Sequence, residues 1–301
     1  MISSLDASSQ SFLMGLQQIQ QRVQRAQQEL TTGLKINSVS DAPDQIAELW
    51  QTRSSLSQVQ QIQSNLGQVQ TETNTAESVL QSATTLMDRA ATLGAQGANG
   101  TTDAQTRQAL AGELGSVLEQ LVSTANTSVQ GRYIFSGNSD QTAPYSIDLT
   151  QSSPISAYQG SPSTRQIQSG DGSLFSVGQT AQQIFDSPNA QQNVFVSVNN
   201  LRQALLNNDS AGINSAMSDV QNAGTYLNQQ LAFYGTTQNK ISQATDYGST
   251  LQVQLQTQIS NLQDADMTAA IEELTQGQTQ QQAALQSKAL VPRTTLFNFL
   301  A

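Results

Sequence analysis

The stretch SFLMGLQQIQQRVQRAQQELTTG, residues 11–33, decides the fold. Its apolar residues lie 4, 3, 4, 3 and 4 positions apart, which is the heptad pattern of a helix that pairs with another helix. They are Phe12, Leu16, Ile19, Val23, Ala26 and Leu30. Gly33 ends the pattern, because glycine is the preferred residue just past a helix. The sequence therefore predicts a helix of about 30 residues whose apolar stripe needs a partner.

Similar stripes recur along the chain. One runs from Ile46 to Ala90 and predicts a helix of about 50 residues, which a shorter helix follows. Near the other end, a stripe from Ile213 to Leu262 predicts a second helix of about 50 residues. A last helix follows, and we expect the carboxylate of Asp266 to cap its first turn. Because the two ends carry helices of matching lengths, we expect them to pair with each other.

Glycine and proline concentrate in the middle of the chain, where the heptads stop and short β-prone pieces appear. The predicted fold is therefore mostly α, a long antiparallel coiled coil or helical bundle built from both chain ends with a small β-rich insert. Its expected parts are residues 1–40 (N-terminal helix and linker), 41–130 (first half of the bundle), 131–190 (β-rich insert), 191–262 (second half of the bundle) and 263–301 (C-terminal helix). Ser40 and Asp41 in the linker are expected to cap the helix that follows them.

The composition leaves few residues for chemistry. The chain has no cysteine and no histidine, which removes thiolate nucleophiles and the commonest metal ligand and general base. Only 11% of its residues are charged, whereas 49 are glutamine. The net charge of −10 opposes binding to nucleic acid. The sequence contains no run of 18 apolar residues, so it does not predict membrane insertion. We expect no enzyme activity, no catalytic residues, no cofactor and no metal, and we interpret the pair Glu272–Glu273 as a charge cluster near a helix start.

Both ends of the chain resemble the terminal signatures of bacterial flagellins. At the N-terminal end the match is LTTGLKINS (residues 30–38) followed by SDAP (40–43). At the C-terminal end it is ISNLQDADM (259–267), QQQAAL (280–285) and the pair Leu296–Phe297. The family signature residues are Gly33, Ile36, Asn37, Ser38, Asp41, Asp264 and Asp266.

A third motif resembles another branch of the same family. GRYIFSG, residues 131–137, is similar to the segment where helix gives way to sheet in the hook–filament junction (hook-associated) proteins, and its signature residues are Arg132, Phe135 and Gly137. The resemblance thus implies a structural subunit of the flagellar filament, with the hook–filament junction protein as the alternative. A more distant alternative from another class is a secreted coiled-coil adaptor or translocator.

The resemblance also implies an architecture. The terminal helices would line a hollow tube, the bundle would form the next layer, and the insert would project outward. The assembly stripe would consist of Phe12, Leu16, Ile19, Val23, Leu30, Ile271, Leu274, Leu285, Leu296 and Phe297. Expected partners are identical subunits in a homopolymer, neighbouring hook-associated or cap proteins, and an export chaperone on the C-terminal helix. The expected location is extracellular, on the bacterial flagellum, after export through the flagellar type III channel.

Overall fold

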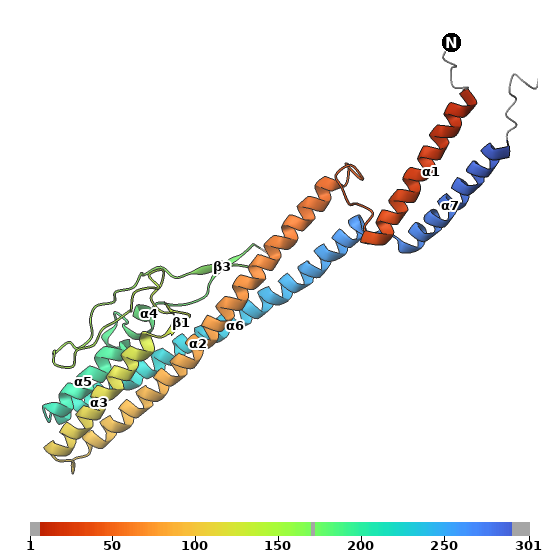
Figure 1. Ribbon diagram of the computed structural model, residues 1–301. Coiled ribbons are helices and arrows are strands. Elements are labelled where there is room, and N and C mark those ends of the chain that lie inside the picture. Colours follow the sequence, from red (N-terminus) through yellow and green to blue (C-terminus); the bar gives the residue numbers. More distant parts are fainter. Residues whose placement is uncertain (1–6, 170–171, 291–301) are drawn as a thin grey trace, which may run out of the picture. The chain divides into compact units, whose positions relative to one another are not determined.

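Helices dominate the computed structural model, which describes residues 7–169 and 172–290 (Figure 1). The helices are α1 (Ala7–Thr32), α2 (Ile46–Ala98), α3 (Ala104–Ala125), α4 (Ala181–Phe185), α5 (Val194–Leu206), α6 (Ser210–Gln263) and α7 (Met267–Leu290), with a 3₁₀ turn η1 (Ala190–Gln192). The strands are β1 (Ser128–Val129), β2 (Arg132–Tyr133), β3 (Gln166–Gln168) and β4 (Leu174–Ser176). The prediction of a mostly α fold with a small β-containing middle is confirmed.

The chain forms two compact units. Unit 1 combines residues 1–58 with residues 252–301, and unit 2 consists of residues 59–251. The helices α2 and α6, of 53 and 54 residues, therefore contribute to both units. Each unit contains sequence from both halves of the chain, as the stripes predict.

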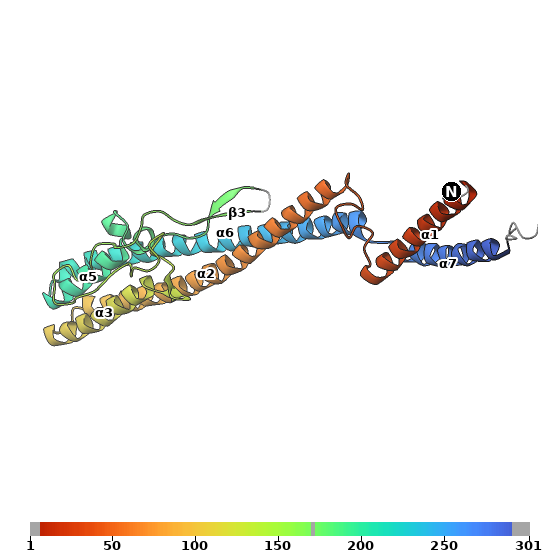
Figure 2. The ribbon, with the colours of Figure 1, turned by 45° about the horizontal axis from the view of Figure 1, so that its top comes forward.

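Unit 2 holds one large apolar core. Leucines of α2, α3 and α5 are buried in it together with small residues of α6, including Leu80, Leu114, Leu118, Leu201 and Ala223. Figures 1 and 2 both show α3 alongside α5. Burial of this many methyl and methylene groups supplies the main driving force for the folding of this unit.

The segment between α3 and α5 is anchored to this core by its aromatic side chains. Phe135 and Phe185 are fully buried, and the ring of Phe135 meets those of Phe185 and Tyr234 edge-on at 6.1 and 6.5 Å. Tyr145 packs edge-on against Phe195 at 5.0 Å. In the described part of this segment, regular strand forms two small antiparallel hairpins, β1–β2 and β3–β4, and the rest is mostly irregular chain anchored by its aromatic rings.

The hairpin β3–β4 covers a second, smaller core. Ile167 pairs across the hairpin with Phe175, and both pack against apolar residues of α2 and α6. Among these are Leu66, Val69 and Ile241. Leu174, on the opposite face of its strand, is 65% exposed.

Candidate assembly surface

The terminal helices α1 and α7 lie antiparallel to each other in unit 1 (Figure 1). At one end of the pair, Leu34 forms a bridge with Asp264. Near the other end, Nζ of Lys288 lies 5.4 Å from the centroid of the Phe12 ring. The apolar stripe of α1 therefore packs against a helix from the opposite end of the sequence.

The seam between α1 and α7 is narrow because the α7 side is built from small residues. Val23 and Ala26 of α1 and Ala270 of α7 are buried in it. A Cβ added at Gly277 would lie 2.6 Å from Cγ2 of Val23, so only glycine allows this approach without a shift. Five other residues of the predicted stripe are partly covered; they are Phe12, Leu16, Ile19, Leu30 and Leu274.

Two large apolar residues of α7 are more than half exposed, whereas Leu274 is partly covered. Ile271 is 54% exposed and Leu285 is 52% exposed, although both belong to the predicted assembly stripe. Further exposed apolar side chains lie on the same helix pair. We call the set Leu13, Met14, Met267, Ile271 and Leu285 the outer face. Leu296 and Phe297, the last two predicted stripe residues, lie outside the described residues.

An arginine crosses the seam near its middle. Nη2 of Arg22 donates to Oε1 of Gln280 at 2.6 Å, and Nη1 lies 3.2 Å from Oε1 of Glu273. The two α7 residues are one heptad apart, so the guanidinium spans two turns of the partner helix. Both members of the ion pair are partly exposed, and the pair by itself stabilises the fold by less than about 1 kcal/mol.

The two halves of the family signature meet at the base of this pair, in a segment we call the joint (residues 33–41 and 260–266). The backbone N–H of Ala265 donates to the carbonyl oxygen of Gly33 at 2.9 Å, and that of Lys35 donates to Gln263 at 2.8 Å. Gly33 has φ +72°, a left-handed conformation that glycine adopts without strain. The two signatures therefore form one hydrogen-bonded structure, although over 200 residues of chain separate them.

Gln263 holds the centre of the joint and is only 8% exposed. Its Oε1 accepts a hydrogen bond of 2.6 Å from Nη2 of Arg53, and its Nε2 donates to the carbonyl oxygen of Ile36 at 3.5 Å. Nζ of Lys35 donates to the carbonyl of Asn261 at 2.9 Å, where the last turn of α6 favours a cation. The amide side chain thus joins the linker, α2 and the end of α6.

Asp41 does not cap α2, contrary to the sequence-based expectation. Its Oδ2 accepts from the backbone N–H groups of Ser38 at 2.6 Å and Asn37 at 2.9 Å, and α2 begins only at Ile46. These hydrogen bonds, led by the one from Ser38, lower the pKa of the Asp41 carboxyl. The carboxylate turns back because the N–H groups before it are nearer than those of the helix.

Asp266 caps α7, as the sequence predicts. Its Oδ1 accepts from the backbone N–H groups of Thr268 at 2.9 Å and Ala269 at 3.1 Å. These donors have no partner within the helix, so the carboxylate satisfies them and also favours the positive end of the helix dipole.

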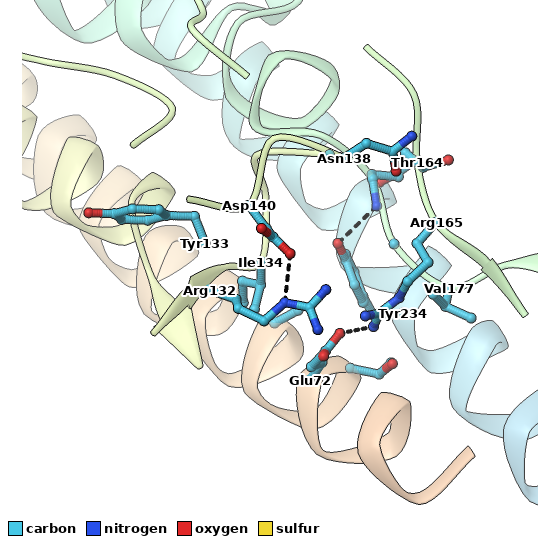
Figure 3. Close-up of a pocket in the computed structure, with 15 residues that line it drawn as sticks. Glu72, Arg132, Tyr133, Ile134, Asn138, Asp140, Thr164, Arg165, Val177 and Tyr234 are labelled. Carbon is cyan, nitrogen blue, oxygen red and sulfur yellow. Dashed lines mark hydrogen bonds and ion pairs between the residues drawn. The ribbon is translucent and has the colours of Figure 1, made fainter. Parts of the chain in front are cut away.

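The remaining signature residues lie in unit 2, where Phe135 is in the large core and Arg132 and Gly137 line a cavity of about 140 Å³ (Figure 3). Nε of Arg132 bonds Oδ2 of Asp140 at 2.6 Å, and Arg165 pairs with Glu72. Gly137 has φ +63°, and a side chain there would collide with the carbonyl oxygen of Ser161.

The charged side chains around this cavity form ion pairs with each other. Each carboxylate already pairs with an arginine, and the Oη of Tyr234 accepts from the backbone N–H of Gln179 at 3.2 Å. Burial raises the pKa of Tyr234 above its ordinary value. The contacts fasten the insert to α2 and α6, which is a structural task.

Neither a membrane span nor a metal cluster is found in the described part of the chain. No helix there is long and apolar enough to cross a bilayer. No three acidic side chains are placed to hold a metal ion within residues 7–169 and 172–290.

Several residues of this surface escaped the sequence analysis. Gln263 is one of 49 glutamines, and nothing in its neighbourhood along the chain marks it as buried. Gly277 sits inside a helical pattern, and such a glycine usually has a packing reason, so this one could have been found. Leu13 and Met14 lie just off the heptad stripe.

Two family models match the chain. The bacterial flagellin N-terminal helical region matches residues 3–140, and the bacterial flagellin C-terminal helical region matches residues 217–300. Together the two matches include α1, both halves of the joint, α2, α3, most of α6 and all of α7.

Individual relatives carry a more specific name. Flagellar hook-associated protein 3 of Salmonella typhimurium is 28% identical over 282 residues, covering 86% of each chain. The Escherichia coli protein of that name is 27% identical and covers 90% of each chain. A structure of a putative flagellar hook-associated protein from Vibrio parahaemolyticus has a TM-score of 0.65, at 21% identity over 74% of this chain and all of that one.

Proposed function

The chain belongs to the bacterial flagellin family, and on this premise we propose that it is a structural subunit of the flagellum that joins the filament to the hook. Between the two alternatives that the sequence left open, the relatives favour the junction protein over the filament subunit. Both curated relatives are hook-associated proteins, and each matches over most of its length. The motif that contains Arg132, Phe135 and Gly137 points the same way.

The outer face is the observation that carries the assembly part of this proposal. In a self-contained helix pair, the large apolar side chains face the partner and the polar ones face water. In α7 this holds only in part, since Leu274 is partly covered but Ile271 and Leu285 are exposed, and the buried residues Ala270 and Gly277 are small. Exposed apolar faces of this kind mark interaction sites. We propose that neighbouring subunits cover the outer face in the assembled flagellum.

The partners follow from this placement. Identical subunits would form a ring or tube through their terminal helices, and hook-associated or cap proteins would contact the same layer. An export chaperone would cover the C-terminal helix before assembly. The protein would act outside the cell, after passage through the flagellar type III channel; the absence of cysteine in the chain suits export in an unfolded state.

Deletion of the gene tests the junction role against the filament role. If the protein joins hook and filament, the cells lose the filament while a separate filament subunit is secreted into the medium as monomer. If the cells lose the filament and no other subunit is secreted, the protein is the filament subunit and the junction proposal fails.

Complementation of the deletion tests the outer face. Ile271→Ser combined with Leu285→Ser should leave the filament missing, although the secreted monomer keeps its helix content, because both side chains are exposed. Leu174→Ser is the matched control, since Leu174 is 65% exposed but lies in unit 2. Equal filament recovery with both variants would contradict an assembly role for the outer face.

A further inference from the structure

The packing of α1 on α7 is repetitive and does not by itself select one alignment. The apolar residues of α1 recur in heptads, and the small residues Ala270, Gly277 and Ala284 of α7 also recur every seven positions. A shift of one heptad moves one helix by about 10 Å along the other and again places small residues opposite the stripe. Val23 would then lie opposite Ala270 or Ala284 instead of Gly277.

Two contacts of the pair do not repeat. The first is the Arg22 guanidinium, which reaches Glu273 and Gln280. After a shift in one direction Arg22 would face Gln280 and Ser287, neither of which is charged. After a shift in the other direction it would face Asp266, whose carboxylate already caps α7, and Glu273; Arg22 therefore opposes only the first shift, and the second is opposed by the joint.

The second contact is the joint. Gln263 bonds Arg53 and Ile36 through its side chain and Lys35 through its carbonyl. These groups lie at the base of both terminal helices, so the bonds exist in only one alignment of α1 with α7. The buried amide would lose its partners after a shift, which is unfavourable for a side chain that is 8% exposed.

We infer that Arg22 and Gln263 are positioning residues that select one register of the terminal helix pair. In this register Phe12 lies beside Lys288, which places Leu13 and Met14 level with the turn that follows Leu285. The register therefore fixes which part of α7 lies beside the exposed apolar residues of α1. The inference about the register depends only on the contacts described above. Its consequence for assembly rests on the proposed function.

Disulfide trapping measures the register directly, because the chain has no cysteine of its own. A Cβ at position 277 would lie 3.9 Å from the Cβ of Val23, within the range of a disulfide. Val23→Cys with Gly277→Cys therefore reports the observed register. Val23→Cys with Ala270→Cys and Val23→Cys with Ala284→Cys report the two shifted registers.

In the otherwise unchanged full-length monomer, we expect the 23–277 disulfide to dominate. Adding Arg22→Ala and Gln263→Ala should raise the ratio of a shifted disulfide to the 23–277 disulfide by about tenfold or more, equivalent to about 1.4 kcal/mol of register preference. Arg25→Ala with Gln258→Ala is the matched control, because both side chains are exposed on the same two helices. The control should leave the ratio unchanged.

Three results would overturn the inference. They are an unchanged ratio in the Arg22→Ala, Gln263→Ala background, loss of all three disulfides together, and shifted disulfides as abundant as 23–277 before either substitution. Loss of all three would mean that the residues hold the helices together without selecting an alignment. Assembly distinguishes failure of the proposed function from failure of this inference. If a variant keeps the observed register and an intact outer face but never joins a flagellum, that result argues against the proposed function alone.

Discussion

Nε of Arg107 donates a hydrogen bond of 2.9 Å to the carbonyl oxygen of Gly97, across the turn that joins α2 to α3. Arg107 is 6% exposed, and its guanidinium also bonds the side chain of Asn208 and the carbonyl of Asn99. Asn208 lies in the turn between α5 and α6 and has φ +54°. One buried cation therefore fastens both turns at this end of unit 2.

Arg107→Ala should lower the free energy of unfolding of unit 2 by about 1–3 kcal/mol, since it leaves the carbonyl oxygen of the buried residue Gly97 without its donor. Urea denaturation followed by circular dichroism measures the change. Arg89→Ala is the matched control, because the pair of Arg89 with Glu113 has side chains that are each 53% exposed. Its effect should stay below about 1 kcal/mol. Similar losses for both arginines would show that burial of Arg107 is unimportant.

Gly277→Ala should weaken the α1–α7 pair, even though alanine is the better helix former by about 1 kcal/mol. The new Cβ would lie 2.6 Å from Cγ2 of Val23, a β-branched side chain with little freedom to move. Amide hydrogen exchange along α7 should accelerate. Gly15→Ala in α1 is the control, because no atom lies within 4 Å of its Cβ, and it should slow exchange.

Adding Val23→Ala to Gly277→Ala should restore slow exchange in α7, since the shortened side chain makes room for the new methyl group. If Gly277→Ala alone slows exchange as Gly15→Ala does, the seam is looser than the distance to Val23 indicates.

The periodicity of the sequence was enough to predict the helices and their pairing. The stripe from Phe12 to Leu30 became α1, and its partner α7 came from the other end of the chain, as the sequence predicts. Periodicity also grouped Ile271 and Leu285 with the assembly stripe. Periodicity could not show that these two side chains are exposed. It gives the angular positions of residues on one helix, but it does not say which face of the helix contacts a partner.

The joint was visible only as a family signature, not as a structure. Asp41 illustrates the reason, because its carboxylate could accept from N–H groups on either side, and the sequence does not weigh the two. Gln263 depends on Arg53 and Ile36, both over 200 positions away. Contacts of such separation leave no trace in local propensity or period.

Asp266→Ala should destabilise the first turn of α7 by about 1 kcal/mol, the usual effect of removing a helix cap. Amide exchange at Thr268 and Ala269 should quicken, because their N–H groups lose the carboxylate oxygen that accepts them. Asp266→Asn should preserve slow exchange, since asparagine caps as well as aspartate. We expect the change in melting temperature to be larger in the assembled form than in the monomer, where the terminal helices lack neighbours. Equal changes in both forms would contradict that difference.

The turn at residues 37–41 should open in acid. The hydrogen bonds from Ser38 and Asn37 hold the pKa of Asp41 below its ordinary value of 3.8, so they stabilise the turn above that pH. As the pH falls through the lowered pKa of the folded protein, the carboxyl gains a proton and this stabilisation is lost. The amide proton resonances of Asn37 and Ser38 should therefore titrate together below pH 3.8, whereas Asp41→Asn should abolish the titration. A midpoint at or above the ordinary value would mean that the two N–H groups do not favour the ionised form of Asp41.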